Sequence, residues 1–256
     1  MRVFAVSDIH ADYAVNAQWV AGLSDTDYRE DVLILAGDVT DELPLLERCL
    51  STFVRCFRKV LFVPGNHELW VARDGEDRSS LQKFSEVLSV VESTGASTQT
   101  FFERGVMIIP FFAWYDYSFG EPNEELRARW SDYHACRWPE GYAEAQIAAH
   151  FAAMNRQRHI GLPVDSAQKV ITFSHFLPRI DVMPSFIPES KKFIYPILGT
   201  AGLDHEIRRL NSSVHVYGHS HVNRRVELDG VLYINNAFGY PNETRTSKQL
   251  LCIHEC

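Results

Sequence analysis

The chain has 256 residues, of which 46% are hydrophobic and 23% are charged, and its formal net charge is −8. This length and composition suit one α/β domain with a sizeable core, which we place over residues 1–256. The acidic balance argues against a protein that binds nucleic-acid duplexes, because phosphate contacts need clustered Lys and Arg side chains.

The first 95 residues alternate between short apolar runs and amphipathic segments. The apolar runs predict strands at residues 2–6, 31–36 and 59–63. The amphipathic segments predict helices at residues 13–23, 42–58 and around 81–91. Asp12 is the expected cap of the first helix. Ser79 or Ser80 should cap the third, which Gly95 should end. Such alternation predicts parallel strands.

After residue 95 the pattern changes and then resumes. Residues 98–110 indicate a hairpin with its turn at residues 103–105. Further elements are expected as helices at 143–157 and 201–210, strands at 169–173 and 214–217, a hairpin at 223–235 and an edge strand at 249–254. This pattern by itself predicts an α/β fold and leaves the arrangement of the sheets open.

Five of the predicted strands are followed by polar residues that can bind metals. In chain order these residues are Asp8, His10, Asp38, Asn66, His175, His219 and His221. Binding sites in open α/β sheets lie just beyond the carboxyl ends of the strands, so these side chains can meet although the sequence separates them. Carboxylate, amide carbonyl and imidazole groups together suit Mn, Fe, Zn or Mg. Bound metals would also let an acidic chain accept a small anionic substrate.

The order of the motifs resembles that of the calcineurin-like metallophosphoesterase superfamily. The motifs are Asp8-Ile9-His10, Gly37-Asp38, Gly65-Asn66-His67-Glu68, His175 and Gly218-His219-Ser220-His221. The resemblance implies a four-layer α/β/β/α sandwich of two mixed β-sheets flanked by helices. It also implies two divalent metal ions, of which Asp8, His10 and His221 hold the first, and Asn66, His175 and His219 the second. Asp38 is the candidate for the carboxylate that bridges them.

The resemblance implies a dinuclear metal-dependent phosphoesterase that acts on a small phosphorylated substrate by attack of a metal-bridging hydroxide. A monoester or a pyrophosphate-like compound is the favoured substrate. A cyclic-nucleotide phosphodiesterase, a nuclease of the same superfamily and a binding protein without catalytic activity are the alternatives. The ligand set does not decide between Mn, Fe, Zn and Mg.

His67 follows Asn66 directly, and in the family this histidine acts as a general acid or orients the phosphate. Asp41 stands where some members have an aspartate that pairs with the histidine, although it could instead cap the helix that follows. Glu42 replaces the arginine of the protein phosphatase branch, which argues against that activity. Other cations that could meet a phosphate are Arg73, Arg179, Lys191 and Lys192, all of which we expect to be surface charges.

Two long segments do not belong to a minimal sheet-and-helix pattern. Residues 111–140 are rich in aromatic side chains, and residues 176–200 contain four prolines. Loops of this length usually serve as lids or binding loops, so we expect both insertions to form walls of the substrate pocket. The alternative is that the aromatic residues cover a sheet edge or form a contact in a homo-oligomer.

The cysteines and the apolar stretches indicate the compartment. The five cysteines are odd in number and have no C-x-x-C spacing, so we expect buried free thiols in a reducing compartment. A strand that begins at residue 2 leaves no room for a signal peptide. No apolar stretch approaches the ~20 residues that a helix needs to cross a bilayer. We therefore expect a cytoplasmic protein with no membrane partner.

Overall fold

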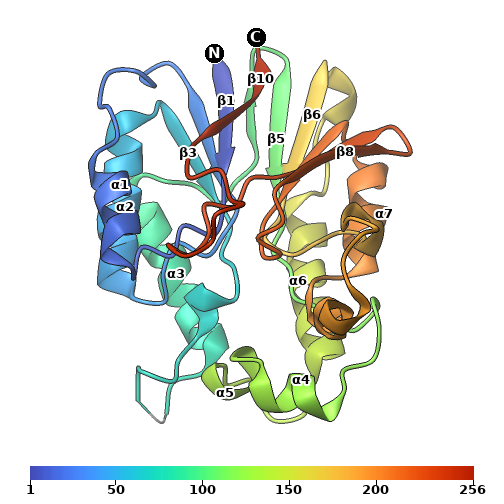
Figure 1. Ribbon diagram of the computed structural model, residues 1–256. Helices are drawn as coiled ribbons and strands as arrows, with labels where there is room; N and C mark the ends of the chain where they lie inside the picture. The colour runs from blue at the N-terminus through green and yellow to red at the C-terminus, as the bar shows by residue number, and fades with distance from the viewer. Residues whose placement is uncertain (76) are drawn as a thin grey trace.

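The computed structural model describes residues 1–75 and 77–256, and its core is a pair of β-sheets that face each other (Figure 1). The first sheet has the strand order β10-β1-β2-β3. Its strands are β1 (Arg2–Val6), β2 (Val32–Leu35), β3 (Lys59–Phe62) and β10 (Leu251–Glu255). The predicted parallel pairing of β1, β2 and β3 is confirmed, and β10 lies antiparallel to β1 at the edge. This pairing brings the two chain ends side by side.

The second sheet is mixed and has the order β4-β5-β6-β7-β9-β8. Its strands are β4 (Phe101–Glu103), β5 (Val106–Pro110), β6 (Lys169–Phe173), β7 (Val214–Tyr217), β8 (Arg224–Leu228) and β9 (Val231–Asn235). Strands β5, β6, β7 and β9 are parallel neighbours. The two predicted hairpins, β4–β5 and β8–β9, supply the antiparallel pairs.

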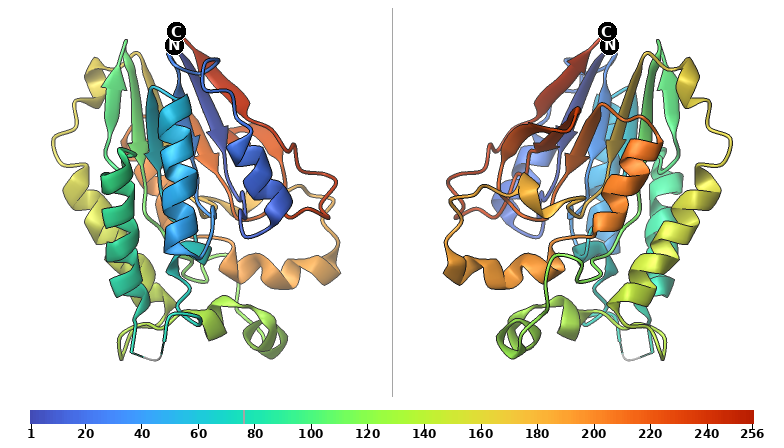
Figure 2. Two further views of the ribbon diagram at one scale, coloured as in Figure 1. Left: turned by 90° about the vertical axis from the view of Figure 1, so that its left-hand side faces the viewer. Right: turned by 90° about the vertical axis from the view of Figure 1, so that its right-hand side faces the viewer.

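Helices cover the outer faces of both sheets, which confirms the four-layer sandwich (Figures 1 and 2). The first sheet is covered by α1 (Ala14–Ala21), α2 (Leu43–Cys56) and α3 (Ser80–Thr94), and the second by α6 (Glu144–Arg158) and α7 (Ala201–Arg209). Two short helices, α4 (Glu124–Arg129) and α5 (Asp132–Ala135), lie beyond the carboxyl ends of the strands. Turns of 3-10 helix occur at His67–Leu69, Val164–Ser166, Ile180–Val182 and Glu189–Ile197.

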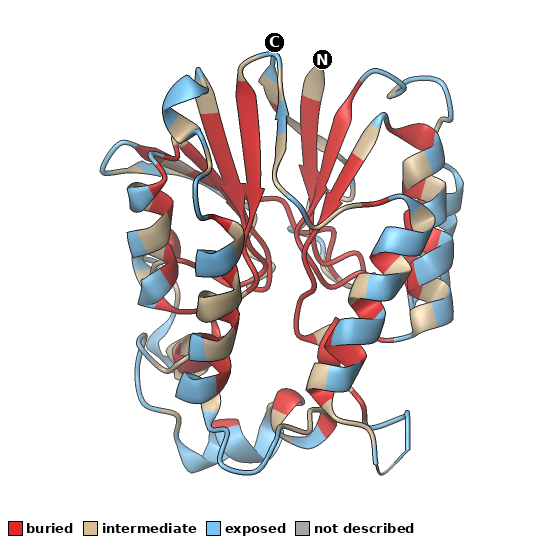
Figure 3. Cartoon of the chain, turned by 180° about the vertical axis from the view of Figure 1, so that it is seen from behind, coloured by how far each residue is buried: buried red, intermediate tan, exposed pale blue. Residues whose placement is uncertain are grey.

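Strands β1, β2, β3, β5, β6, β7 and β9 are largely buried on both faces, as continuous apolar runs predict, whereas β4, β8 and β10 are partly exposed (Figure 3). In β1, Val3 and Ala5 pack between the sheets, whereas Phe4 and Val6 pack against the helices. Leu46 and Phe53 of α2 complete that second cluster. The first sheet is therefore held from two sides, and the loops at its carboxyl ends start from rigid positions.

The helix caps show where local sequence decides the structure and where it does not. Ser79 and Gln82 form the capping box of α3, and Gly95 ends it in the left-handed conformation at φ 86°. The expected cap at Asp12 is wrong, because Tyr13 occupies the N-cap position of α1 without a side-chain bond. The Asp12 carboxylate instead accepts a hydrogen bond from Thr40 Oγ1 at 2.6 Å. A tertiary partner has replaced the local one.

The two insertions are more ordered than the sequence suggests. Asn123 accepts a hydrogen bond from the Leu126 N–H and so caps α4 within the first insertion, and nearly half of the second is 3-10 helix.

All five cysteines are free, and Cys49 and Cys56 are buried as expected. Cys136 and Cys252 are only half-buried, and the expectation is wrong for Cys256, which is exposed beside the paired chain ends. Within the described residues, no helix combines the length and the apolar character that crossing a membrane requires.

Candidate metal centre

The carboxyl ends of strands from both sheets meet in the middle of the molecule, where Figure 3 shows buried loops converging. Asp8 lies just after β1, Asp38 after β2 and Asn66 after β3. His175 comes from the end of β6, and His219 from the end of β7. The structure thus brings together all seven residues that the sequence nominated as ligands, with His10 and His221 in the same loops.

Asp8, His10 and His221 form the first of two ligand clusters, with one ligand atom from each within 4.8 Å of the others. The Nε2 atoms of His10 and His221 are 3.1 Å apart. His221 Nε2 is also 3.2 Å from Asp8 Oδ1. The Asp8 carboxylate is held by the Ser7 hydroxyl and the His219 backbone N–H, so its position is fixed by the loops themselves.

Asp38, His175 and His219 form the second cluster, which Asn66 completes. His175 Nε2 lies 3.4 Å from Asp38 Oδ2, 3.1 Å from His219 Nδ1 and 3.1 Å from Asn66 Oδ1. Asp38 also shares a group of ligand atoms with His10 and His67. It therefore stands between the two clusters, as a bridging carboxylate must.

The spacing of these donors fits divalent cations. His175 Nε2 faces three acceptor atoms and His221 Nε2 faces two, so a single N–H proton cannot satisfy all the acceptors in either cluster. Two ligands bound to one ion at about 2.0–2.2 Å each lie about 3.0–3.5 Å apart, which is the spacing seen here. The donors are nitrogen and oxygen atoms without thiolates, so they suit borderline and hard ions such as Mn, Fe, Zn or Mg.

The seven nominated ligands together form a metal cage, and the charges within it show the same preference for cations. Burial lowers the pKa of His175 and of His221, but nearby carboxylates raise the two values to about 9 and about 10. Asp38 is the main carboxylate beside His175, and Asp8 beside His221. Burial lowers the pKa of His10 and of His219 to about 3. Without a metal, the cage must hold protons on two imidazoles, and a bound metal would displace them.

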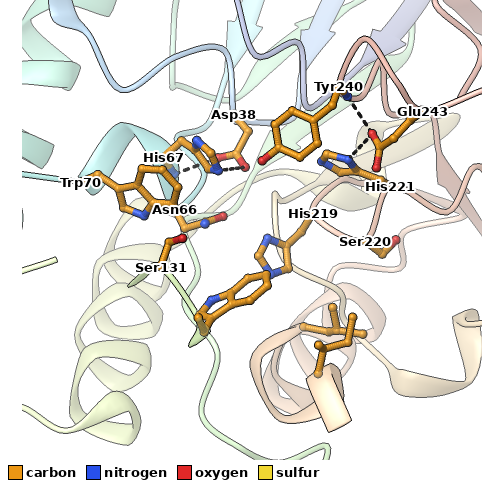
Figure 4. Close-up of a pocket in the computed structure, with 13 residues that line it drawn as sticks. Asp38, Asn66, His67, Trp70, Ser131, His219, Ser220, His221, Tyr240 and Glu243 are labelled. Carbon is orange, nitrogen blue, oxygen red and sulfur yellow. Dashed lines mark hydrogen bonds and ion pairs between the residues drawn. The ribbon is translucent and has the colours of Figure 1, made fainter. Parts of the chain in front are cut away.

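The ring nitrogens that face away from the cage have their own partners, which fix the tautomers. His175 Nδ1 donates to the Ala36 carbonyl at 2.9 Å, and His219 Nε2 to the Ile197 carbonyl at 3.1 Å. His221 Nδ1 lies 2.7 Å from Glu243 Oε2 (Figure 4). Partners of this kind leave the opposite nitrogen of each ring as the metal ligand. His219 therefore presents Nδ1, while His175 and His221 present Nε2.

Glu68 connects the loop that follows β2 with the loop that follows β3. Its buried carboxylate accepts hydrogen bonds from the backbone N–H groups of Gly65, Asp38, Val39 and Thr40 at 2.6–3.2 Å. Burial and the neighbouring Asp38 carboxylate raise the pKa of Glu68 to about 7. The last residue of the Gly65-Asn66-His67-Glu68 motif is therefore a positioning residue.

Backbone strain marks the same loops. Five of the seven nominated ligands, Asp8, His10, Asp38, His219 and His221, have φ between 47° and 67°. Residues other than glycine rarely adopt this conformation, and its cost is typical of functional sites. Gly65 lies so close to the Asp38 carboxylate and the His175 ring that a Cβ would collide with both. The loops thus hold strained backbone conformations that position the candidate ligands.

Asp132 is a buried residue of the site that the sequence did not reveal. Its Oδ1 accepts hydrogen bonds from Asn66 Nδ2 at 2.9 Å and from Trp70 Nε1 at 2.7 Å. Its Oδ2 accepts one from Trp130 Nε1 at 2.7 Å. The first bond turns the amide so that Asn66 Oδ1 faces His175 and the second cluster. Asp132 follows no strand, so no spacing rule could have singled it out.

Replacing Asp132 with asparagine should weaken the second metal site. The new amide offers one oxygen where three N–H groups now donate, so Asn66 loses its fixed orientation. The apparent affinity for the second ion should fall about 10–100-fold, as for other groups that orient ligands. Calorimetric titration with Mn or Zn would measure the loss. Asp165→Asn, at an exposed turn, should leave the affinity unchanged.

A hollow of about 250 Å³ opens over the two clusters (Figure 4). Trp130 and Ser131 of the first insertion line it, together with Ile194 and Leu198 of the second. The other lining residues are Asp38, Asn66, His67, Trp70, His219, Ser220, His221, Tyr240 and Glu243. Both insertions therefore supply walls of the hollow above the cage. In the part of the chain that the structure describes, no Lys or Arg lines this hollow.

His67 lies at the edge of the cage, and its side chain is 12% exposed. Its ring stacks on Trp70 with 3.7 Å between ring centroids, and Nε2 is 3.8 Å from Asp38 Oδ2. His67 also shares a group of ligand atoms with His10 and Asp38, so it is close enough to touch either a metal or a bound phosphate.

Asp41 does not pair directly with His67. Among the described residues no hydrogen bond joins the two side chains, and Asp41 Oδ1 instead lies 3.5 Å from Arg73 Nη1. Asp41 is not a helix cap either, because Glu42 holds the N-cap position of α2. Asp41, His67 and Arg73 line a second hollow of about 450 Å³. The partner of Asp41 is therefore the Arg73 guanidinium and not the His67 imidazole.

Three of the other candidate cations, Arg179, Lys191 and Lys192, lie outside both hollows, as expected for surface charges. Arg179 binds Asp181 and Asp229, and Lys192 binds Glu189. Arg73 is the exception, because it is exposed but lines the hollow beside His67.

Comparison with known proteins agrees with this geometry. The family model described as calcineurin-like phosphoesterase matches residues 1–223. The chain is 30% identical over 266 residues to "[Acyl-carrier-protein] phosphodiesterase PptH" from Mycobacterium tuberculosis, a match that covers 96% of this chain and 80% of the relative. The crystal structure of the phosphopantetheinyl hydrolase PptH from Mycobacterium tuberculosis superimposes with a TM-score of 0.75 and 26% identity, over 94% of this chain and 90% of the other.

Proposed function

This chain belongs to the calcineurin-like phosphoesterase family as a metal-dependent phosphoric ester hydrolase, and from that premise we propose that it cleaves a phosphodiester with one slender aliphatic arm. The relative PptH is a phosphodiesterase of acyl carrier protein and is also titled a phosphopantetheinyl hydrolase. A phosphopantetheine group joined to a carrier protein is a substrate of this class. The proposal replaces the monoester or pyrophosphate-like compound favoured from the sequence with a diester, the substrate class of the phosphodiesterase alternative.

The charge of the hollow is the observation that carries the choice of a diester. A diester has one negative charge, whereas a monoester approaches two near neutral pH. The described lining residues of the hollow include no Lys or Arg to balance a second charge, and they include Glu243. A monoester would meet only the charge of the metals and would face that carboxylate.

The apolar walls support an uncharged, slender arm. Trp70, Trp130, Ile194 and Leu198 line the hollow around the cage. The two indole N–H groups are both bound to Asp132, so their rings are held in place before a substrate arrives. Such preorganised apolar walls favour an aliphatic chain at low entropic cost.

Two divalent ions fit the proposed reaction, with Mn as the first metal to test and Fe, Zn and Mg as alternatives. Asp8, His10, Asp38 and His221 would hold one ion, and Asp38, Asn66, His175 and His219 the other. When bound, such ions supply positive charge for the phosphoryl oxygens and acidify the attacking water. His67 would protonate the leaving alkoxide, since it lines the hollow beside Asp38 and has a side chain that water can reach.

The preference for diesters can be measured directly on the metal-loaded protein. The value of kcat/KM should be at least about tenfold higher for bis(4-nitrophenyl) phosphate than for 4-nitrophenyl phosphate, because an extra unit charge near a carboxylate costs ~1–3 kcal/mol at an effective dielectric constant of about 20. A faster monoester would overturn the choice of substrate while leaving the family assignment intact.

The cytoplasmic location expected from the sequence remains part of the proposal. Its support is that all five thiols are free, including the pair Cys49 and Cys56 within one helix.

A further inference from the structure

A third hollow, of about 380 Å³, adjoins the metal cage on the side of His221. His221 lines this hollow as well as the one over the metals, so the two share a wall. Figure 4 shows Trp70 and His221 on opposite sides of the metal hollow. A substrate with one arm beside Trp70 would therefore extend its other arm past His221 into the third hollow. The residues that line it include Pro184, Phe186, Ile187, Arg224 and Arg245.

Two guanidinium groups lie in this hollow without a carboxylate partner. Arg224 Nη1 donates to the Val182 carbonyl at 2.7 Å, and Arg245 is exposed. In the described residues, neither arginine has an Asp or Glu oxygen within 4.0 Å, whereas Arg179 has three such partners. In a chain with a net charge of −8, this pair is a local excess of positive charge.

An exposed aromatic ring stands beside the arginines. Phe186 is 76% exposed, among the highest values for a large apolar side chain of this protein, and Pro184 and Ile187 flank it in the same hollow. Exposed aromatic residues together with Arg are typical of the central contacts in protein–protein interfaces. A small anion would need the arginines but would gain nothing from Phe186 projecting into solvent.

We propose that the Phe186, Arg224 and Arg245 surface docks an acidic protein that carries the phosphodiester. This inference rests on the proposed function, because it requires a diester whose second arm ends on a protein. The docked protein would place its modified side chain beside His221, with the scissile phosphate over the metals and the slender arm between Trp70 and Trp130. The arginines would meet acidic side chains of the partner, and Phe186 would meet its apolar residues.

The test compares three diesters on the Mn-loaded enzyme. They are a holo acyl carrier protein, a short peptide bearing the same phosphopantetheinyl serine, and bis(4-nitrophenyl) phosphate. Arg245→Glu should lower kcat/KM for the carrier protein about tenfold or more, mainly through KM, as expected for reversing a charge in a contact. It should change the values for the peptide and the nitrophenyl diester less than about twofold.

Matched variants separate docking from folding. Arg225→Glu makes the same change of charge one residue along β8, on an exposed side chain outside the hollow, and should not affect the carrier protein. Arg224→Gln keeps a donor for the Val182 carbonyl while it removes the charge, and should act in the same direction as Arg245→Glu. Phe186→Ser should also raise KM for the carrier protein alone.

The outcomes distinguish the inference from the proposed function. Equal losses on all three substrates would place the arginines in the diester site and overturn docking. No loss on the carrier protein would overturn it too, as would an enzyme that cleaves the nitrophenyl diester and the peptide but not the carrier protein. An enzyme that cleaves no diester at all would instead refute the proposed function.

Discussion

Replacing Asp38 with alanine should empty the metal cage and remove nearly all turnover. Asp38 is the carboxylate that approaches both clusters, and its Oδ2 lies 3.4 Å from His175 Nε2. Burial would raise the pKa of Asp38, but the surrounding imidazoles, His175 foremost, hold it well below its usual range. The side chain is thus ionised at every working pH. Without it, Asp8 would be the one carboxylate left among the nominated ligands to offset the charge of two neighbouring cations.

The expected loss affects both the metal content and the turnover. Elemental analysis should find fewer than about one metal ion per chain instead of about two, and kcat/KM should fall at least about 10³-fold, because the metals supply several kcal/mol of charge stabilisation at about 1.4 kcal/mol per tenfold. Circular dichroism should show an intact fold. Asp41→Asn, three residues further on, should keep both metals. An Asp38→Ala protein that retained two ions and its activity would show that another residue bridges them.

The sequence allowed most of the site to be predicted because its ligands follow from strand geometry. A buried strand needs a continuous apolar run, and that run has to end where the chain meets the polar cage. Phe173 and Tyr217 close two such runs just before His175 and His219. The predicted strands at residues 2–6, 169–173 and 214–217 therefore match β1, β6 and β7 residue for residue. Once the strand ends were predicted, the candidate ligands followed from them.

The residues that escaped prediction act through contacts between distant segments. Asp132 reaches Asn66 across 66 positions of sequence, and Glu243 reaches His221 from a loop without regular structure. Tyr240 stacks on His10 with 4.2 Å between ring centroids, although 230 positions separate them. No period or motif encodes such pairs. The same cause explains why the contact between Asp41 and Arg73 was not foreseen, since Arg73 lies in a loop that the sequence did not place.

Replacing His67 with alanine should slow the reaction in a way that depends on the leaving group. The ring lines the metal hollow beside Asp38, where it can give a proton to an alkoxide as the ester bond breaks. A dialkyl phosphodiester has a strongly basic alkoxide as its leaving group, so kcat for this substrate should fall about 10²–10⁴-fold. Nitrophenolate is stable as an anion near neutral pH, so the rate for bis(4-nitrophenyl) phosphate should fall much less. Comparing the two rates measures proton donation specifically.

The metal content of the same variant decides between the two positions that the structure permits for His67. Its ring shares a group of ligand atoms with His10 and Asp38, so it could bind an ion as well as a phosphate. As a general acid, His67 can be removed while about two ions per chain remain, and His67→Gln should be as slow as His67→Ala. A fall in metal content would identify His67 as a ligand. If alkyl and nitrophenyl esters were slowed equally while both metals were retained, His67 would act by orienting the phosphate and not as a general acid.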